Sequence, residues 1–403
     1  MKILYIVPFV PWEIKVRSFN LIPRLSREHE ISLVCVSTLP PNASQDAWIR
    51  KYCAEFVYVP LNKIGAALRC ASALFSSTPV RIAYCDLNAA KAKIANLYER
   101  VHPNVVYVER WRALQLVPPS ALNKTLCDPT DSMTLHNRRL LERGAWWERM
   151  IAWEEYRKFR TFEGKLARQP ALNVFCSELD LDVVRKQAPD ASYGIVPNGV
   201  DGTSLYFKKA EDSEPATILF TGSLRYGPNR HAVDFFMDKI FPIVRREIPS
   251  AKFMVVGNGA SIVLSKYLKS EGFQAIDFVP DLRPYLERAT VAVAPLTIAS
   301  GVSNKLAEGF AVGTPVVATK VACGDLPVTD GDQLFIADSP EVFARRVVQL
   351  INDSTLRIAM TQKARKLVDE QFDWEIVFRK MEELLEQVAA KSRNSKEVAV
   401  LPA

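Results

Sequence analysis

Short runs of consecutive apolar residues, many of them β-branched, recur along the whole chain and alternate with amphipathic stretches. Unbroken apolar runs are typical of strands buried on both faces of a parallel sheet. Their alternation with helical patterns predicts a doubly wound α/β fold. The predicted strands are Ile3–Val7, Ile31–Val36, Phe56–Val59, Val105–Val108, Thr125–Cys127, Leu172–Cys176, Gly194–Val196, Thr217–Thr221, Lys252–Val256, Ala275–Phe278, Val291–Ala294, Pro315–Ala318 and Leu334–Ala337.

The strand series occurs twice, which predicts two similar domains in the 403 residues. Near residues 185–215, the segment VPNGVD indicates a turn and KKAEDSEPA a polar linker. We therefore predict domains of residues 1–200 and 201–373. A last helix of about residues 374–403, capped by Asp373, is expected to pack back on the first domain. Ligands of such folds bind beyond the carboxyl ends of the strands, so a cleft between the two domains is the predicted site.

Charge is distributed unevenly, with net +8 for residues 1–200 and −1 for residues 201–403. A basic half favours a phosphate-bearing partner or an anionic membrane surface, although a solvated basic face fits equally well. The sequence contains no run of 18 apolar residues, so it predicts no membrane span. The apolar N-terminus is interrupted by proline, so we interpret it as a strand and not as a signal peptide. Seven scattered cysteines without a C-x-x-C pair favour a reducing, cytoplasmic location.

The segment PLTIASGVSNKLAEGFAVGTPVVAT, residues 295–319, carries the strongest functional signal. Gly301 permits a tight turn after a buried strand, and Ser303 and Asn304 are candidate N-caps for the next helix. A helix N-terminus at this edge of a sheet binds phosphate readily, and Lys305 adds a positive charge there. Glu308, one turn later, is suited to accept hydrogen bonds from a ribose diol. The alternative is an ordinary helix cap with a solvated Lys and Glu.

This segment resembles the donor-site signature of the family 4 retaining glycosyltransferases, which have the GT-B fold of two Rossmann-like domains. It is similar to the variant in bacterial exosortase-associated (PEP-CTERM) sugar transferases. The resemblance extends over nearly the whole chain, through PFVPWEIKVRSFNLIPRLS, FRTFEGKLA, VPNGVD, FTGSLRYGPN and FVPDLRPYLERATVAVAP.

The resemblance implies a nucleotide-sugar donor, a UDP- or GDP-sugar, and no cofactor. Glu308 matches the glutamate that holds the donor ribose, and Gly301 to Lys305 match the loop and helix start around the diphosphate. Residues 280–282 match the stretch against the nucleobase, and Gly222 a strand end close to the donor phosphate. The implied donor-binding residues are Gly222, Arg230, Pro280, Asp281, Leu282, Gly301, Val302, Ser303, Asn304 and Leu306, and the catalytic ones are Arg225, Lys305, Glu308 and Asp131.

The sequence departs from the family pattern at the donor site. Ser300 stands where the family has the first glutamate of its Glu-x7-Glu pair. Arg225 and Arg230 replace the usual Arg and Lys-Gly after the first strand of the second domain, and Trp12–Lys15 replaces a glycine-bearing loop. Lys305, Arg225 and a helix terminus would stabilise a leaving diphosphate without a metal ion. Retention by front-face attack is implied by the resemblance alone.

Candidate acceptor residues lie in the first half of the chain. Asp128 and Asp131 follow a predicted strand, where Asp131 is suited to orient an acceptor hydroxyl; the alternative is that both cap the next helix. Lys15 and Arg17 follow the first strand and are expected to meet the phosphates of a lipid-linked acceptor.

Two segments are candidates for membrane contact. The basic, tryptophan-rich residues 138–168 are predicted to form one long helix, and residues 64–75 are a second apolar candidate. A core helix with a solvated back explains residues 138–168 equally well.

We therefore predict transfer of a hexose-type sugar from a nucleotide sugar to a glycan or a lipid-linked acceptor in polysaccharide synthesis, at the inner face of the membrane. A catalytically degenerate nucleotide-sugar-binding protein and a nucleotide-sugar epimerase are the alternatives. Gly257-Asn258-Gly259 is weak evidence for a dinucleotide, and no aromatic-basic strand motif supports nucleic acid as a partner.

Overall fold

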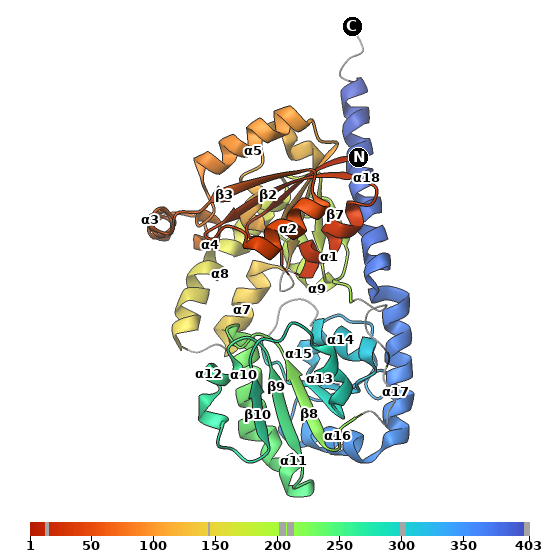
Figure 1. The fold of residues 1–403 in the computed structure, drawn as a ribbon. Coiled ribbons are helices and arrows are strands. Elements are labelled where there is room, and N and C mark those ends of the chain that lie inside the picture. Colours follow the sequence, from red (N-terminus) through yellow and green to blue (C-terminus); the bar gives the residue numbers. More distant parts are fainter. Residues whose placement is uncertain (13–15, 144–145, 201–206, 208–212, 299–303, 399–403) are drawn as a thin grey trace. The chain divides into compact units, whose positions relative to one another are not determined.

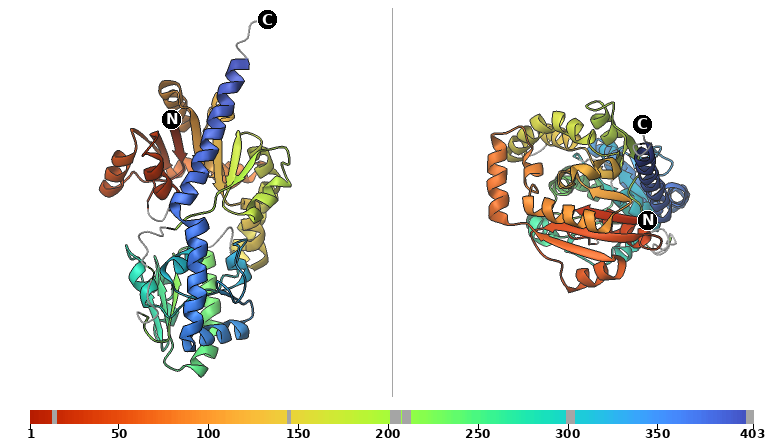
Figure 2. Two further views of the ribbon diagram at one scale, coloured as in Figure 1. Left: turned by 90° about the vertical axis from the view of Figure 1, so that its right-hand side faces the viewer. Right: turned by 90° about the horizontal axis from the view of Figure 1, so that it is seen from above.

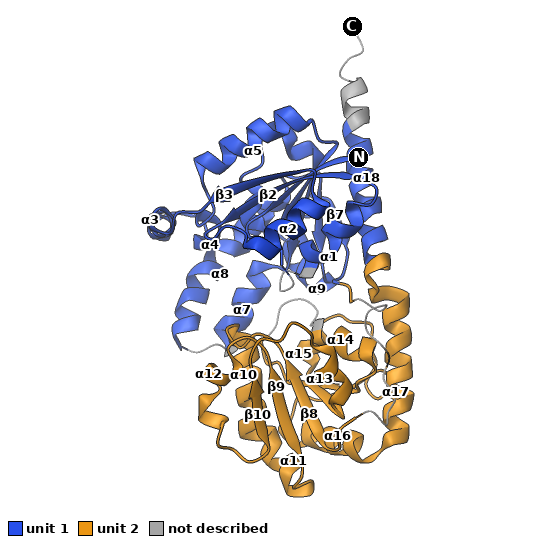
Figure 3. Ribbon diagram, in the orientation of Figure 1, with its two compact units in different colours: residues 1–198, 377–403 blue, residues 199–376 orange. Residues whose placement is uncertain are grey.

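The structure, a computed structural model, describes residues 1–12, 16–143, 146–200, 207, 213–298 and 304–398. The chain divides into two compact units (Figure 3). Unit 1 contains residues 1–198 and 377–403, and unit 2 contains residues 199–376. Each unit is an α/β sandwich whose sheet lies between helices (Figure 1).

Unit 1 is built on a seven-stranded sheet in the order β3-β2-β1-β4-β5-β6-β7, and every neighbouring pair is parallel. The central strands β1, β4, β5 and β6 contain almost only buried residues, as predicted, whereas the edge strands β3 and β7 are partly exposed. Their bounds are β1 Lys2–Val7, β2 Glu30–Ser37, β3 Glu55–Pro60, β4 Val105–Glu109, β5 Thr125–Thr130, β6 Leu172–Phe175 and β7 Tyr193–Ile195.

Unit 2 is built on a six-stranded parallel sheet in the order β10-β9-β8-β11-β12-β13. All thirteen predicted strands are present, and the doubly wound α/β class is confirmed. The bounds are β8 Thr217–Thr221, β9 Lys252–Val256, β10 Phe273–Ile276, β11 Val291–Ala294, β12 Val316–Ala318 and β13 Phe335–Ile336.

Helices connect the strands in both units. In unit 1 they are α1 Val16–Leu25, α2 Ala43–Tyr52, α3 Lys63–Leu74, α4 Val80–Ala83, α5 Asn88–Val101, α6 Trp111–Leu114, α7 Met133–Arg143, α8 Trp146–Ala167 and α9 Glu178–Arg185. In unit 2 they are α10 Gly227–Phe235, α11 Phe241–Glu247, α12 Ala260–Val263, α13 Arg283–Arg288, α14 Asn304–Val312, α15 Lys320–Cys323, α16 Pro340–Asn352 and α17 Ser354–Leu367.

The last helix, α18 Trp374–Val398, begins in unit 2 and continues into unit 1 from Val377 (Figure 2). Asp373 caps it by accepting a hydrogen bond from the Glu375 N–H at 2.8 Å, as its sequence position predicted. Within unit 1, Glu382 of this helix contacts His29 at 2.9 Å.

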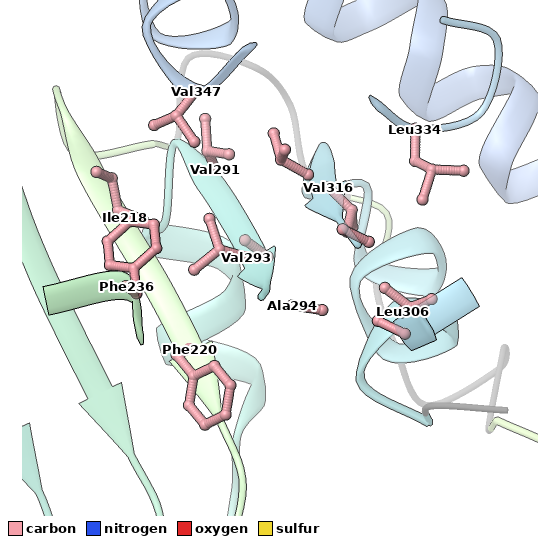
Figure 4. Packing of buried hydrophobic residues seen from close by; sticks show 14 of the residues in the cluster. Ile218, Phe220, Phe236, Val291, Val293, Ala294, Leu306, Val316, Leu334 and Val347 are labelled. Atoms are coloured by element: carbon pink, nitrogen blue, oxygen red, sulfur yellow. The ribbon is translucent and has the colours of Figure 1, made fainter. Parts of the chain in front are cut away.

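The core of unit 2 lies between the sheet and its helices (Figure 4). Phe220 and Val293 project from neighbouring strands, and Phe236 packs beside them. Leu306 of α14 is completely buried in the same core. The side chain of Leu306 therefore fixes α14 by packing, and its predicted contact with the donor stays a prediction.

The prediction of one long helix over residues 138–168 was wrong. Two helices, α7 and α8, lie there and pack against each other. Hydrophobic periodicity continues through both, so it did not reveal the break. Among the described residues no helix is long and apolar enough to cross a membrane, and all seven cysteines are free thiols.

Candidate functional site

The strand order of unit 2 reverses between its two central strands, β8 and β11. In open α/β sheets the loops that leave such strands diverge to opposite sides, and ligands bind beyond the carboxyl ends of these strands. Gly222 follows β8 directly, and the segment leading to α14 follows β11. Five of the ten predicted donor-binding residues, Gly222 and Gly301 to Asn304, belong to these two stretches of the sequence.

Gly222 is required by the geometry of the turn after β8. Its φ of +140° is disfavoured for residues with a side chain, and a Cβ there would lie 2.7 Å from Nδ2 of Asn229. A Cβ on Gly257, after the neighbouring strand β9, would collide with the carbonyl group of Gly222. Both glycines therefore allow the two strand ends to approach each other closely.

Lys305, in the first turn of α14, lies across the switch point from α10. Its ammonium group donates a hydrogen bond to Oδ1 of Asn229 at 3.1 Å and lies 5.0 Å from the ring centre of Phe220. Asn229 is 7% exposed and is fixed in turn by donating to the Ser223 carbonyl at 2.9 Å. Burial lowers the pKa of Lys305 to about 8, against the opposing effect of Glu308.

Glu308 lies one helical turn after Lys305, on the same face of α14. Burial raises the pKa of its carboxyl group, and the charge on Lys305 opposes this rise. The pair places a donor of hydrogen bonds and an acceptor of hydrogen bonds side by side at the start of one helix.

The two predicted arginines of unit 2 lie in different surroundings. Arg225 is exposed and donates to Oδ1 of Asn258 at 3.1 Å. Arg230 is partly buried, and its Nε has no hydrogen-bond partner among the described residues. An unsatisfied buried donor is costly, so Arg230 is the better placed of the two to receive an anion.

The predicted nucleobase stretch, Pro280 to Leu282, precedes α13. Asp281 is engaged by Arg283 at 2.7 Å, and Leu282 packs against a small cluster that includes Met254. This stretch therefore follows β10 with Pro280 exposed and Leu282 packed inward.

Several predicted residues lie outside the described part of the chain. These are Lys15, Gly301, Val302 and Ser303, and also Ser300. The backbone of Asn304 begins α14, which agrees with the expected helix start.

In unit 1, the strand order reverses between β1 and β4, and a buried ion pair lies beside this point. Nε of Arg17, in α1, donates a hydrogen bond to the carboxylate of Asp128. Arg17 is 3% exposed, and Asp128 is fully buried. Tyr107 donates to the same carboxylate, while Nη1 of Arg17 donates to the Pro197 carbonyl at 3.1 Å. Arg17 and Asp128 are thus internal partners, and their predicted contact with an acceptor stays a prediction.

Sequence reasoning missed Glu109 and Arg110, which follow the buried run of β4. Glu109 is 2% exposed and accepts a hydrogen bond from Ser18, and burial raises its pKa. Arg110 pairs with Asp131 at 3.3 Å and has φ of +75°, while Thr130 has φ of +72°. Thr130 is β-branched, so its left-handed backbone conformation is strained, and such strain is often found at functional sites. A charged pair after an apolar run was the one available signal.

Neither Asp128 nor Asp131 makes the helix cap considered as an alternative. Glu163 of α8 serves α7 instead, because it accepts from the Met133 N–H at 2.6 Å and the Thr134 N–H at 3.1 Å. Ser132 completes the cap by accepting from the Leu135 N–H at 3.2 Å.

Carboxylate clusters for a metal ion are absent from the described residues. Two Asp-x-Asp triplets occur, and both bind internal groups. Asp180 accepts from the Ser132 N–H at 2.7 Å, and Asp182 pairs with Arg185. Asp330 accepts from the Ile336 N–H at 2.7 Å, and Asp332 pairs with Lys363. Metal-independence stays a prediction.

Residues 215–353 match the family model described as glycosyl transferases group 1. This part of the chain is therefore similar to the group 1 glycosyl transferases. The matched range lies inside unit 2 and contains Gly222, Asn229, Lys305 and Glu308. The candidate site therefore lies in the part of the chain that matches this family model.

Curated proteins match part of the chain. A capsular polysaccharide biosynthesis glycosyltransferase of Staphylococcus aureus, CapM, is 28% identical over 152 residues, which are 36% of this chain and 40% of CapM. The chain matches less than half the length of its curated relatives, 45% and 40% for two of them.

Solved structures resemble the chain over nearly its full length. Sucrose-phosphate synthase of Thermosynechococcus elongatus superposes with a TM-score of 0.73 at 12% identity, covering 97% of this chain and all of that one. The Anabaena protein HepE in complex with UDP gives 0.68 at 13%, covering 96% and 100%. The fold is therefore GT-B, as the sequence resemblance implied.

Proposed function

We propose that the protein is a retaining, metal-independent glycosyltransferase. It takes a hexose-type sugar from a nucleoside-diphosphate sugar and transfers it to a hydroxyl group of a glycan or lipid-linked saccharide in polysaccharide synthesis. The main support for this proposal is the arrangement at the unit 2 switch point. There Lys305 lies beside Asn229 and Glu308, within the residues that match the group 1 family model.

The chemistry requires stabilisation of a departing nucleoside diphosphate. As the bond to the anomeric carbon breaks, negative charge accumulates on the diphosphate, and preorganised cations and N–H groups lower this barrier. Lys305 supplies a cation held in place by Asn229, and the N-terminal turn of α14 supplies its dipole. Arg225 and Arg230 of unit 2 add charge on the α10 side.

The remaining donor groups are assigned to its nucleoside. Glu308 accepts two hydrogen bonds from the ribose hydroxyls, which gives its partly buried carboxylate hydrogen-bond partners. Pro280 to Leu282 form the wall against the base. The structural likeness to a protein with UDP bound supports UDP as the nucleotide, with GDP as the second choice.

Unit 1 is assigned to the acceptor. The partly exposed Asp131, positioned by Arg110, is suited to orient an acceptor hydroxyl. The departing phosphate then assists removal of the acceptor proton on the same face of the sugar, which gives retention. The name of the CapM relative supports a capsular or related polysaccharide precursor as the acceptor class.

The test is release of nucleoside diphosphate from a panel of UDP-, GDP-, ADP- and dTDP-sugars. We expect slow hydrolysis of one donor by the wild-type protein, reduced about 10²–10³-fold in Lys305→Met, since removing one charge-stabilising group costs this much. The control is Lys320→Met, which removes a lysine from another short helix of unit 2. Equal hydrolysis by wild type and Lys305→Met would reject the assignment.

The two alternatives give different products. A nucleotide-sugar epimerase would invert a carbon atom of the sugar without releasing the sugar from the nucleotide. A catalytically degenerate protein would bind a nucleotide without turnover. Proton NMR of the released or transferred sugar separates these results, and an α-linked donor that yields an α-linked product supports retention.

A further inference from the structure

Helix α3 turns an apolar stripe toward solvent. Ile64, Leu68 and Phe75 lie on one helical face at spacings of four and seven, and they are 73%, 67% and 94% exposed. The residues that α3 buries are small, Ala66 and Ala73. An ordinary surface helix directs its large apolar residues inward, so this arrangement is the reverse of normal packing.

The first turns of α8 repeat the pattern with larger side chains. Trp146, Met150 and Trp153 recur at spacings of four and three and are 75%, 66% and 59% exposed. Trp147 and Ile151 lie beside them, 46% and 61% exposed.

Contacts within unit 1 join these two helices. Lys158 of α8 donates to the Ala73 carbonyl at the end of α3, at 2.6 Å. Glu155 of α8 accepts from the Val80 N–H, after α3, at 2.7 Å. Ile151 lies seven residues before Lys158, on the helix side that meets α3. Trp147 lies on the same side of α8 as Ile151 and Lys158, whereas Trp146, Met150 and Trp153 lie on another side of the helix. The exposed apolar residues of α3 therefore neighbour Trp147 and Ile151 in unit 1, where α3 lies at the outer edge (Figure 1). We call this the α3–α8 surface.

Charge around the α3–α8 surface is positive. Residues 61–85 contain Lys63, Arg69 and Arg81 and no acidic residue. Three of the four acids of α8 are engaged internally: Glu154 pairs with Lys158 at 2.5 Å, and Glu155 and Glu163 are buried. The fourth, Glu148 in the first turn, is partly exposed. Lys63, Arg149 and Arg160 are exposed.

We propose that the α3–α8 surface docks on an anionic lipid bilayer. A contiguous apolar surface of this kind marks an interaction site. Tryptophan prefers the bilayer–water interface, and exposed cations beside an apolar stripe match anionic headgroups. Such docking deepens the proposed function, because it would present unit 1 to a lipid-linked acceptor. The reason for docking rests on the proposed function, but docking itself does not, because it requires neither a donor nor turnover.

Vesicle flotation of the full chain, without nucleotide, tests the proposal. Vesicles of equal phosphatidylglycerol and phosphatidylcholine are compared with pure phosphatidylcholine at low and high salt. Wild type is expected to float with the anionic vesicles, less so at high salt. The Ile64→Gln/Phe75→Ser variant should bind at least about tenfold more weakly, since each inserted side chain contributes this order of affinity. The matched control is Ile262→Gln in unit 2, where isoleucine is 74% exposed and its loss should change nothing.

Tryptophan fluorescence gives a second readout. The exposed tryptophans of α8 should be quenched by brominated lipid, while Trp111 and Trp374 are buried. Failure of wild type to bind anionic vesicles overturns the proposal. So does a wild-type dimer that Ile64→Gln/Phe75→Ser converts to monomer, because a second copy would then cover the surface. Donor hydrolysis measured on the same preparations keeps a failure of docking distinct from a failure of the proposed activity.

Discussion

At the scale of single residues, Lys305 is distinguished by being a cation in a partly buried position. It has one neutral hydrogen-bond partner, Asn229, and a carboxylate one turn away. Removal from water lowers its pKa to about 8, so its charge is held at a cost that an incoming anion would relieve. This makes pH a direct probe of the proposed diphosphate contact.

Nucleotide affinity is expected to fall as pH rises through 8. Only protonated Lys305 attracts a diphosphate, so the dissociation constant should rise about tenfold between pH 7 and pH 9. Calorimetric titration with the nucleotide that binds measures this change. Lys305→Arg should flatten the dependence, because a guanidinium stays charged over this range. A tenfold rise that persists in Lys305→Arg would assign the titration to another group.

The Arg17–Asp128 pair makes the opposite case, because its charges satisfy each other inside unit 1. Arg17→Ala should lower the free energy of unfolding by about 3–5 kcal/mol, since Asp128 remains as an uncompensated buried charge. Urea denaturation measures the loss. Arg50→Ala is the control: Arg50 also pairs with an aspartate, Asp46, but is 75% exposed, so its removal should leave stability nearly unchanged. If Arg17→Ala lowers the free energy of unfolding as little as Arg50→Ala does, Arg17 is not a structural residue.

Residues at the site differed in how far the sequence revealed them. Gly222, Lys305 and Glu308 lie in short segments that match a signature, so their positions were predicted. Asn229 was missed, because an asparagine after Gly-Pro indicates only a helix start. Arg17 was placed correctly after β1, but its burial depends on Asp128, 111 residues later, a contact that no local pattern reveals.

At the scale of elements, the strands were predicted better than the helices. Strands buried on both faces, such as β1 and β4, have unbroken apolar sequences that depend little on their neighbours. The pair α7 and α8 was misjudged because its break depends on tertiary contacts. Glu163 of α8 caps the start of α7, 30 residues earlier in the chain. The periodicity of the sequence does not predict contacts between residues so far apart.

His136 makes α7 sensitive to acid. Burial, assisted by Arg81 and Arg139, lowers its pKa to about 4. The unfolded chain binds a proton near pH 6.5, so this contribution to stability is present above pH 6.5 and is lost as pH falls toward 4. It amounts to at most about 3 kcal/mol. Unfolding free energies at pH 7 and pH 4.5 should therefore differ less in His136→Gln than in wild type. Parallel pH dependences would exclude this role for His136.

At the scale of the whole molecule, two parallel sheets each present a switch point at the carboxyl ends of their strands. The repeated strand series was sufficient to predict this architecture. Polar and charged groups gather at both points, around Lys305 in unit 2 and around Asp128 in unit 1. This division suits a reaction between two substrates, one held by each unit.

Metal removal should leave turnover unchanged. If Lys305, the arginines of unit 2 and the α14 terminus stabilise the leaving diphosphate, EDTA has nothing essential to extract. Turnover of the active donor before and after exhaustive chelation is the measurement. Activity that disappears with EDTA and returns with Mg²⁺ or Mn²⁺ would contradict this expectation.

The central claim is that the switch point of unit 2 binds a nucleoside diphosphate through Glu308 and Lys305. Isothermal titration with UDP and GDP tests it most directly, using wild type, Glu308→Gln and the unit 2 control Glu341→Gln. The account predicts that wild type binds at least one nucleotide, that Glu308→Gln binds it about tenfold or more weakly through loss of charge-assisted hydrogen bonds, and that the control is unchanged. Absence of binding by wild type, or equal affinity in Glu308→Gln, would contradict it.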